Sequence, residues 1–335
     1  MRRKPLIGIT MGDPAGIGPE IVVKALMNSK VGKTSIPLVF GSFEVIKRAA
    51  LSFAKKAKVK KVETFYNLEN QPGVINVLNC TDLDYKKIKP GKLSVASGKM
   101  AAESLICATL NAIFKKIDGI VTAPLTKKGL FLAGYNFKGH TDFLAQLSST
   151  KKYAMVFVTP KLKLVLVTTH IPLSEVSKKL TKEKIEEKIK LADELLRKAF
   201  KIKNPKIGVC ALNPHSGEEG LLGEEDQKII LPAIKKAQRG KINTFGPYPA
   251  DSIFSPSVSI NFDCIVAMYH DQGLIPLKTK GVGNAVNLTW GLPFVRTSPD
   301  HGTAFDIAGK GIADPRGMVN AILLASKLAR MKVSF

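Results

Sequence analysis

The chain has 335 residues, of which 45% are hydrophobic and 23% charged, a composition typical of a folded globular protein and not of a disordered one. Its net charge of +24 permits binding of nucleic acid or of small anions. No nucleic-acid recognition motif accompanies the charge, so we expect a lysine-rich surface that attracts anionic small molecules, with no nucleic-acid partner.

The apolar runs are strand-sized, far shorter than the ~20 residues that span a membrane. The basic start at Met1–Lys4 leads into a strand and does not resemble a signal peptide. The four cysteines form no CxxC pair, which favours reduced, buried thiols. We therefore expect a cytoplasmic protein without a membrane partner.

Predicted strands and helices alternate along the chain, which indicates an α/β fold with a largely parallel sheet. A chain of this length favours two domains, and without an obvious linker these would be two lobes between which the chain crosses. In chain order, the pattern predicts strand 6–10, helix 21–27, strand 37–40, helix 43–53, strands 59–64 and 73–78, helix 97–116 capped by Ser97, strand 119–122, helix 127–132, a hairpin of 154–159 and 163–169, helix 181–200 capped by Thr181, strand 206–212, helix 224–237, strands 242–245, 264–268 and 285–288, and helix 315–330.

Three of the five histidines follow apolar, strand-like runs within a few residues. His170, His215 and His270 share this placement. Ligands bind at the carboxyl ends of strands in open α/β sheets, and neutral imidazole is a common metal ligand. We therefore expect these histidines to form one metal or catalytic cluster, against the alternative of three separate, locally bonded side chains.

Three other segments carry glycine or cationic residues. The turn GDPAGIG at 12–18 has the spacing of a dinucleotide loop, but Pro14 interrupts it and the following strand lacks the acidic residue of that fingerprint. Lys278, Asn287 and Arg296 lie in a glycine-rich stretch suited to an oxyanion, although ordinary surface charge would explain these residues taken alone. The loop at 300–315 has glycines where backbone can approach a ligand.

Taken together, these segments resemble the 4-hydroxythreonine-4-phosphate dehydrogenase family, which is related to the isocitrate and isopropylmalate dehydrogenases. The resemblance runs through most of the chain and is carried by GDPAGIGPE at 12–20, TAPL at 122–125, GHTDFL at 139–144, TTHIP at 168–172, NPHSGE at 213–218, PAD at 249–251, YHDQGL at 269–274 and HGTAFDIAGKG at 301–311.

The resemblance implies an isocitrate/isopropylmalate dehydrogenase-like fold with two α/β domains and a cleft between them. We expect one catalytic unit of two interleaved lobes, 1–25 plus 140–285 and 26–139 plus 286–335. It also implies a homodimer with its active site at the subunit interface, where metal ligands are shared.

The resemblance also assigns residues to roles. It implies a divalent metal (zinc, magnesium or cobalt) on the three strand-end histidines and NAD or NADP as cofactor. Candidate bases are Asp271 and Lys278, with Asp251 as a third. The expected substrate-binding residues are His140, Thr141, Lys278, Asn287 and Arg296, and the expected cofactor-binding residues are His301, Gly302 and Asp306.

The implied reaction is oxidation of 4-phosphooxy-L-threonine to a β-keto acid that decarboxylates to 3-amino-2-oxopropyl phosphate, in pyridoxal 5'-phosphate biosynthesis. A related acid such as 4-phospho-D-threonate or D-erythronate is the alternative substrate. A phosphate acyltransferase or a nucleic-acid binder is the alternative class, but neither explains the three histidines together with the 301–311 loop.

Overall fold

The structure, a computed structural model, describes residues 3–137, 139–280 and 285–331. They fall into two compact units, unit 1 within 1–151 and 292–333 and unit 2 within 152–291. The chain therefore leaves unit 1 once and returns to it. The lobes expected from the sequence, 1–25 plus 140–285 and 26–139 plus 286–335, divide the chain at other points.

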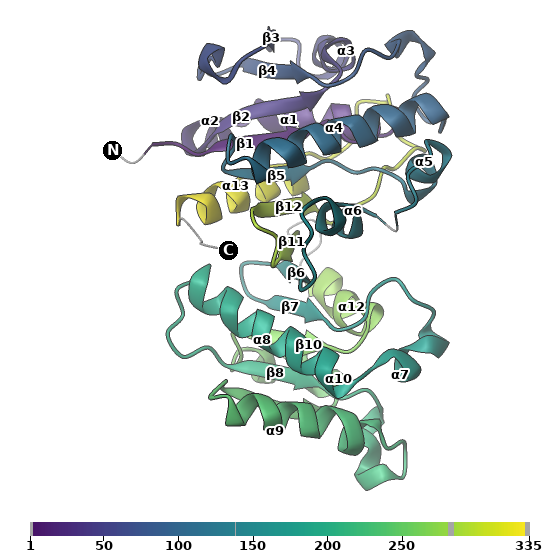
Figure 1. Cartoon of the computed structure of the whole chain (residues 1–335), viewed down its shortest axis with the longest axis vertical. Helices are drawn as coiled ribbons and strands as arrows, with labels where there is room; N and C mark the ends of the chain where they lie inside the picture. Colours follow the sequence, from purple (N-terminus) through teal and green to yellow (C-terminus); the bar gives the residue numbers. More distant parts are fainter. Residues whose placement is uncertain (1–2, 138, 281–284, 332–335) are drawn as a thin grey trace. The chain divides into compact units, whose positions relative to one another are not determined.

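Unit 1 is built on a parallel sheet with strand order β3-β4-β2-β1-β5-β12. Helix α4 packs against β1, β2 and β5, and α13 packs against β12 and β5 (Figure 1). Its elements are β1 Leu6–Thr10, α1 Gly18–Leu26, α2 Ser29–Thr34, β2 Ile36–Gly41, α3 Phe43–Phe53, β3 Lys58–Val62, β4 Val74–Asn79, α4 Val95–Ile113, β5 Gly119–Thr122, α5 Lys127–Leu132, α6 His140–Leu147, β12 Val295–Pro299 and α13 Arg316–Arg330.

Unit 2 has strand order β11-β6-β7-β10-β8-β9. The pairs β11–β6 and β6–β7 are antiparallel, whereas β7, β10, β8 and β9 run parallel. Its elements are β6 Ala154–Val158, β7 Lys163–Leu166, α7 Val176–Lys179, α8 Lys182–Lys198, β8 Ile207–Cys210, α9 Leu231–Arg239, β9 Thr244–Tyr248, α10 Ala250–Ile253, α11 Pro256–Ser259, β10 Cys264–Ala267, α12 His270–Lys280 and β11 Val286–Trp290.

Buried apolar strands explain why both sheets form. All residues of β1, β5, β6, β8 and β10 are buried, as expected for strands that are covered on both faces. A cluster around Leu164, Ile265 and Leu274 packs α12 onto the sheet of unit 2. The predicted α/β class with a largely parallel sheet is confirmed.

The structure corrects one predicted helix start and contains elements that were not predicted. Helix α4 begins at Val95 and is capped by Ser94, whose hydroxyl accepts from the Ser97 amide, so Ser97 is the third helical residue and not the cap. Helix α12 and strand β12 were not predicted, because Pro276 interrupts the helical pattern and the five residues of β12 include polar ones that are nevertheless buried.

Candidate functional site

Three neighbouring strands of unit 2 lead to the three strand-end histidines. Strands β7, β10 and β8 lie side by side in that order and run parallel. They end at Leu166, Ala267 and Cys210. Because parallel neighbours have their carboxyl ends at the same edge of the sheet, the segments with His170, His270 and His215 all leave from one edge.

Backbone pairing continues past the ends of β7 and β10 and brings two of these histidines together. The Val167 amide donates to the Ala267 carbonyl at 2.9 Å, and the Thr168 amide donates to the Met268 carbonyl at 3.1 Å. The Thr168 hydroxyl also donates to the Met268 carbonyl, at 2.7 Å. Beyond this pairing, the rings of His170 and His270 lie 5.6 Å apart between centroids.

The buried side chain of Gln272 joins the ends of β10 and β8. Its carbonyl oxygen accepts from the Met268 amide and its amide nitrogen donates to the Ala211 carbonyl, each at 2.7 Å. Gln272 lies in the first turn of α12, which begins at His270. The start of this helix is therefore fixed to both strands, and with it the backbone of His270.

His215 lies in a strained loop after β8. His215, Ser216, Glu218 and Glu219 all have φ between 39° and 58°, a left-handed conformation that non-glycine residues seldom adopt. The fully buried Asp226 carboxylate fixes the start of this loop by accepting from the amides of Leu212 and Asn213. His170 also has a positive φ, of 50°. Such strain is typical of functional sites.

Carboxylates hold the Nδ1 atoms of two of the histidines. His215 Nδ1 lies 2.7 Å from Glu218 Oε1, and His270 Nδ1 lies 2.6 Å from Asp271 Oδ1. The hydrogen bond to Glu218 and its charge raise the pKa of His215, with a smaller contribution from Asp251. A carboxylate on one ring nitrogen orients the other nitrogen toward a ligand, as in many metal sites.

The donor set fits a divalent metal, but the described residues do not bring it together at one point. Imidazoles oriented by carboxylates suit zinc and similar ions. Across residues 3–137, 139–280 and 285–331, however, no three His, Cys, Asp or Glu side chains are placed to hold one metal ion. His170 and His270 are adjacent, and the described chain supplies no third member of a ligand set beside them.

Two of the candidate bases line one hollow of unit 2. Asp251 and Asp271 share a hollow of about 490 Å³ with Tyr269 and Gln272. The third candidate, Lys278, lies seven residues after Asp271 in α12 and thus on the same helical face. All three therefore lie near the start of α12 or along it.

Unit 1 gathers cationic and polar groups around Arg296. Arg296 is fully buried in β12 and donates to the Thr122 hydroxyl from Nη2 at 2.7 Å and from Nε at 3.2 Å. Burial lowers the pKa of Arg296 to about 9. Burial, and next the charge of Arg296, hold the pKa of His140 well below its ordinary value. His140 is therefore neutral near pH 7, with one donor and one acceptor nitrogen, and does not supply the positive charge expected for a phosphate.

Two predicted substrate-binding side chains carry buried polar atoms that lack a partner among the described residues. These are Nε2 of His140 and Oδ1 of Asn287. Buried polar atoms are nearly always hydrogen-bonded, so such atoms call for a ligand or water. His140 and Thr141 begin α6 in unit 1, whereas Asn287 lies in β11 and Lys278 in α12 of unit 2.

The predicted cofactor loop is held against both ends of α1. The Ile17 amide donates to the Thr303 carbonyl at 2.9 Å, and Lys24 Nζ donates to the carbonyls of Gly311 and Ala313. His301, Gly302 and Asp306 are exposed on this loop. The predicted cofactor-binding residues are thus accessible to solvent on an anchored segment.

Sequence reasoning missed the residues that position the site. Thr122, Gln272, Glu218 and Asp226 were assigned no role, although Thr122, Gln272 and Glu218 lie in the segments that carry the resemblance. Only the pair His215 and Glu218 could have been found from local sequence, because side chains three residues apart can bond within one turn. The bonds of Thr122 and Asp226 depend on strand neighbours and on a later helix.

Each unit places polar and titratable side chains at or beyond the carboxyl ends of parallel strands, which is the arrangement of an α/β enzyme. No helix in the described part of the chain has the length and apolar character that crossing a membrane requires. Residues 33–325 match the family described as "Pyridoxal phosphate biosynthetic protein PdxA". The chain belongs to this family.

Known relatives match this chain over nearly its full length. A protein from Oceanobacillus iheyensis, provisionally named a D-threonate 4-phosphate dehydrogenase, is 45% identical and covers 99% of this chain and 100% of its own. A 4-hydroxythreonine-4-phosphate dehydrogenase from Sulfurihydrogenibium is 41% identical, covering 97% and 99%. The solved structure of the Klebsiella pneumoniae 4-hydroxythreonine-4-phosphate dehydrogenase has a TM-score of 0.88 at 40% identity, covering 97% of this chain and 100% of that one. The predicted family and fold are confirmed, and the chain is an oxidoreductase of this family.

Proposed function

We propose that this protein oxidises 4-phosphooxy-L-threonine with NAD or NADP, giving a β-keto acid that decarboxylates to 3-amino-2-oxopropyl phosphate, in pyridoxal 5'-phosphate biosynthesis. The observation that carries the proposal is the unsatisfied Nε2 of His140 beside the buried Arg296. A phosphorylated acid would offer its anionic oxygens to the guanidinium, and one of its hydroxyl groups would satisfy Nε2 of His140. Membership of the PdxA family supports the same substrate class.

His170, His215 and His270 would hold a divalent cation such as zinc, magnesium or cobalt. When bound, the cation supplies charge stabilisation for oxygen atoms that become negative during the reaction. Glu218 and Asp271 keep Nδ1 of their histidines occupied, so Nε2 is the nitrogen that faces a ligand. Because the described chain does not gather all three, we propose that a homodimer completes the set at its subunit interface.

Removal of the substrate hydroxyl proton requires a base. Asp271, Asp251 and Lys278 are the candidates, and the two carboxylates border the same hollow. Asp271 bonds to His270, which would keep its carboxylate close to the proposed cation. Variants of each candidate, compared by the pH dependence of kcat, would identify the base, since only its loss removes the corresponding limb of the profile.

The remaining assignments concern charge and cofactor. Arg296 and Lys278 would supply positive charge to the phosphate and carboxylate, while His140, Thr141 and Asn287 would supply hydrogen bonds. His301, Gly302 and Asp306 would contact the dinucleotide, which accepts the hydride.

A second candidate substrate is 4-phospho-D-threonate, or the related D-erythronate. Relatives with this activity in their names, such as the Salmonella typhimurium D-threonate 4-phosphate dehydrogenase at 42% identity, match as well as those named for the amino acid. A panel of these acids, assayed by the absorbance of reduced nucleotide, separates the two. The higher kcat/KM identifies the substrate, and no turnover with any of them contradicts the proposed function.

A further inference from the structure

The substrate of the proposed reaction carries more negative charge than the assigned site residues of unit 1 balance. A phosphate monoester has a charge of about −1.5 to −2 near pH 7, and the carboxylate of the acid adds about one more. Of the substrate-binding residues assigned in unit 1, Arg296 is the cation, because the buried His140 is neutral near pH 7 and Thr141 has no charge. A second cation beside Arg296 would bring the positive charge of this unit closer to that of a phosphate dianion.

Lys127 lies beside the start of α6. It is the first residue of α5, and no role has been given to it. A Cβ built at Gly139 would lie 3.7 Å from Lys127 Cε, so the end of the lysine side chain packs against Gly139. Gly139 directly precedes His140 and Thr141, the first two residues of α6. Lys127 is therefore next to the segment that carries two of the proposed substrate-binding residues.

The same end of β5 holds His140 and Arg296. The His140 ring bonds to the backbone of Ala123, and Arg296 donates to the hydroxyl of Thr122, the last residue of β5. Burial, and next the charge of Arg296, lower the pKa of His140, so these two side chains lie close together. Lys127 follows within one short segment, at the edge of the sheet where α/β proteins bind ligands.

The backbone of Lys127 is fixed, whereas its ammonium group is uncommitted. The Thr126 hydroxyl caps α5 by accepting from the Gly129 amide at 2.8 Å, and the Asp13 amide donates to the Pro124 carbonyl at 2.9 Å. These bonds tie the start of α5 to the turn after β1. Lys127 is exposed and makes no hydrogen bond or ion pair within the described residues. It can therefore bind an anion without first breaking an existing contact.

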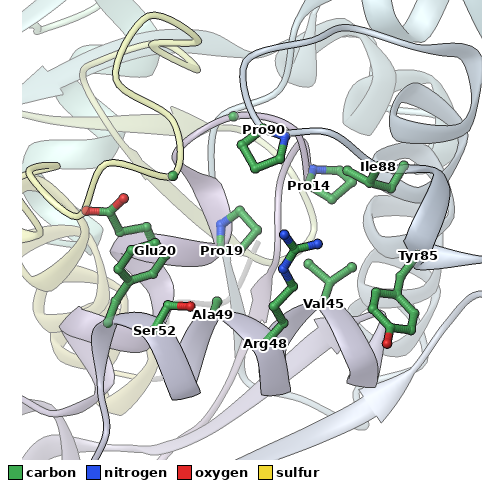
Figure 2. Close-up of a pocket in the computed structure, with 13 residues that line it drawn as sticks. Pro14, Pro19, Glu20, Val45, Arg48, Ala49, Ser52, Tyr85, Ile88 and Pro90 are labelled. Carbon is green, nitrogen blue, oxygen red and sulfur yellow. The ribbon is translucent and has the colours of Figure 1, made fainter.

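Arg48 is another exposed cation of unit 1, and it borders a hollow of about 130 Å³ (Figure 2). Proline rings, among them Pro14 and Pro19, form much of the wall of that hollow (Figure 2). Apolar walls leave the oxygens of a phosphate without donors, which is costly. Lys127 lies instead beside the start of α6, where the buried Nε2 of His140 has no partner among the described residues. A polar substrate group suits this place better than the hollow at Arg48.

We propose that Lys127 binds the phosphate group of the substrate together with Arg296 and so makes the site selective for a phosphorylated acid. The inference rests on the proposed function and names a further residue for it. Lysine binds phosphate as a mobile point charge, which complements the fixed guanidinium of Arg296. The carboxylate is the less suitable partner, because it leaves as CO2 in the proposed reaction and a lysine bound to it would stabilise the acid before decarboxylation.

The test is calorimetric titration of the full-length protein with 4-phosphooxy-L-threonine and 4-phospho-D-threonate, together with KM and kcat for the acid that turns over. Lys127→Ala should raise Kd and KM about tenfold or more, because it removes a charge-assisted bond to the phosphate, with a smaller effect on kcat. Lys127→Arg should recover most of the affinity, since it restores the charge. Lys128→Ala is the matched control, because Lys128 is also exposed but lies about 100° further around α5. Its Kd should stay within about twofold of wild type.

The pH dependence separates phosphate from carboxylate as the group that Lys127 binds. A phosphate monoester loses its second charge below about pH 6, whereas a carboxylate keeps its charge down to about pH 4. We therefore expect the ratio of Kd between Lys127→Ala and wild type to fall severalfold from about pH 7.5 to about pH 5. A ratio that stays constant, or Kd and KM that are unchanged in Lys127→Ala, overturns the inference.

Failure of the inference and failure of the proposed function give different results. If wild type binds a phosphorylated acid through Lys127 yet reduces no dinucleotide, the proposed function fails and the assignment of Lys127 stands. If wild type and Lys127→Ala turn the acid over with the same KM, the function stands and the assignment fails. Wild type that binds neither acid overturns both.

Discussion

The imidazole rings of His170 and His270 lie 5.6 Å apart and are tilted by 42° to each other. They come from the ends of β7 and β10, adjacent parallel strands whose pairing continues through Thr168 and Met268. The sheet therefore brings two imidazoles together, and the proposed metal chemistry depends on this pair.

The bond between His215 and Glu218 provides a test of metal binding. If Glu218 orients the ring of His215, Glu218→Gln weakens zinc binding by about 10–100-fold. His215→Ala would abolish turnover and leave the proposed dimer intact. Metal content after dialysis measures zinc binding, the activity assay measures turnover, and sedimentation measures the dimer. Full activity and full metal content in His215→Ala would exclude His215 as a ligand.

The bond between Thr122 and Arg296 contributes to stability. Thr122→Val keeps the shape of the side chain but removes the acceptor from a buried guanidinium. We expect a loss of about 1–3 kcal/mol in the free energy of unfolding, measured by urea titration. Thr109→Val is the control, because Thr109 is equally buried and its hydroxyl bonds only to the Leu105 carbonyl. If Thr109→Val lowered the free energy of unfolding as much as Thr122→Val does, the bond to Arg296 would not explain the loss.

The lowered pKa of His140 predicts a pH-dependent stability. Because the folded state disfavours the charged imidazole, the unfolded state binds more protons below pH 6.5. The free energy of unfolding should therefore fall as pH decreases from about 6.5, by at most about 1.4 kcal/mol per pH unit. His140→Gln should show a shallower decrease between pH 7 and 5, and equal slopes in the two proteins would contradict a buried neutral His140.

The contact between α4 and α5 requires glycine at position 98. A Cβ at Gly98 would lie 2.0 Å from the Gly129 carbonyl oxygen, whereas a Cβ at Gly32 in α2 would meet nothing within 4 Å. Gly98→Ala should cost about 1–3 kcal/mol or more, and Gly32→Ala should stabilise by up to about 1 kcal/mol. Thermal unfolding of both variants checks the difference, and similar shifts would mean that α4 and α5 can separate freely.

Local signals predicted most of the fold. The bounds of β1, α3, β5 and α5 agree with the predicted ranges, since each has a clear apolar pattern or a cap. Helix α12 was missed because Pro276 breaks that pattern, and its packing on β7 and β10 compensates. The pattern could not show this tertiary support.

The site was predicted in part. Strand-end position placed His170, His215 and His270 at one edge of the sheet, because the carboxyl edge of a parallel sheet follows from the strand pattern, while their role as metal ligands stays a prediction. The order β7-β10-β8, which makes His170 and His270 neighbours, is a long-range property that the pattern does not contain. The neutral state of His140 likewise depends on its burial beside Arg296.

The central claim is metal-dependent, NAD(P)-linked oxidation of a phosphorylated hydroxy acid. Its most direct test is a steady-state assay of metal-stripped protein with 4-phosphooxy-L-threonine or 4-phospho-D-threonate, each nucleotide, and zinc, magnesium or cobalt added back singly. We predict that reduced nucleotide forms only when a divalent metal is restored, and that His270→Ala forms none. Equal rates without metal, or no reduced nucleotide under any combination, would contradict the claim.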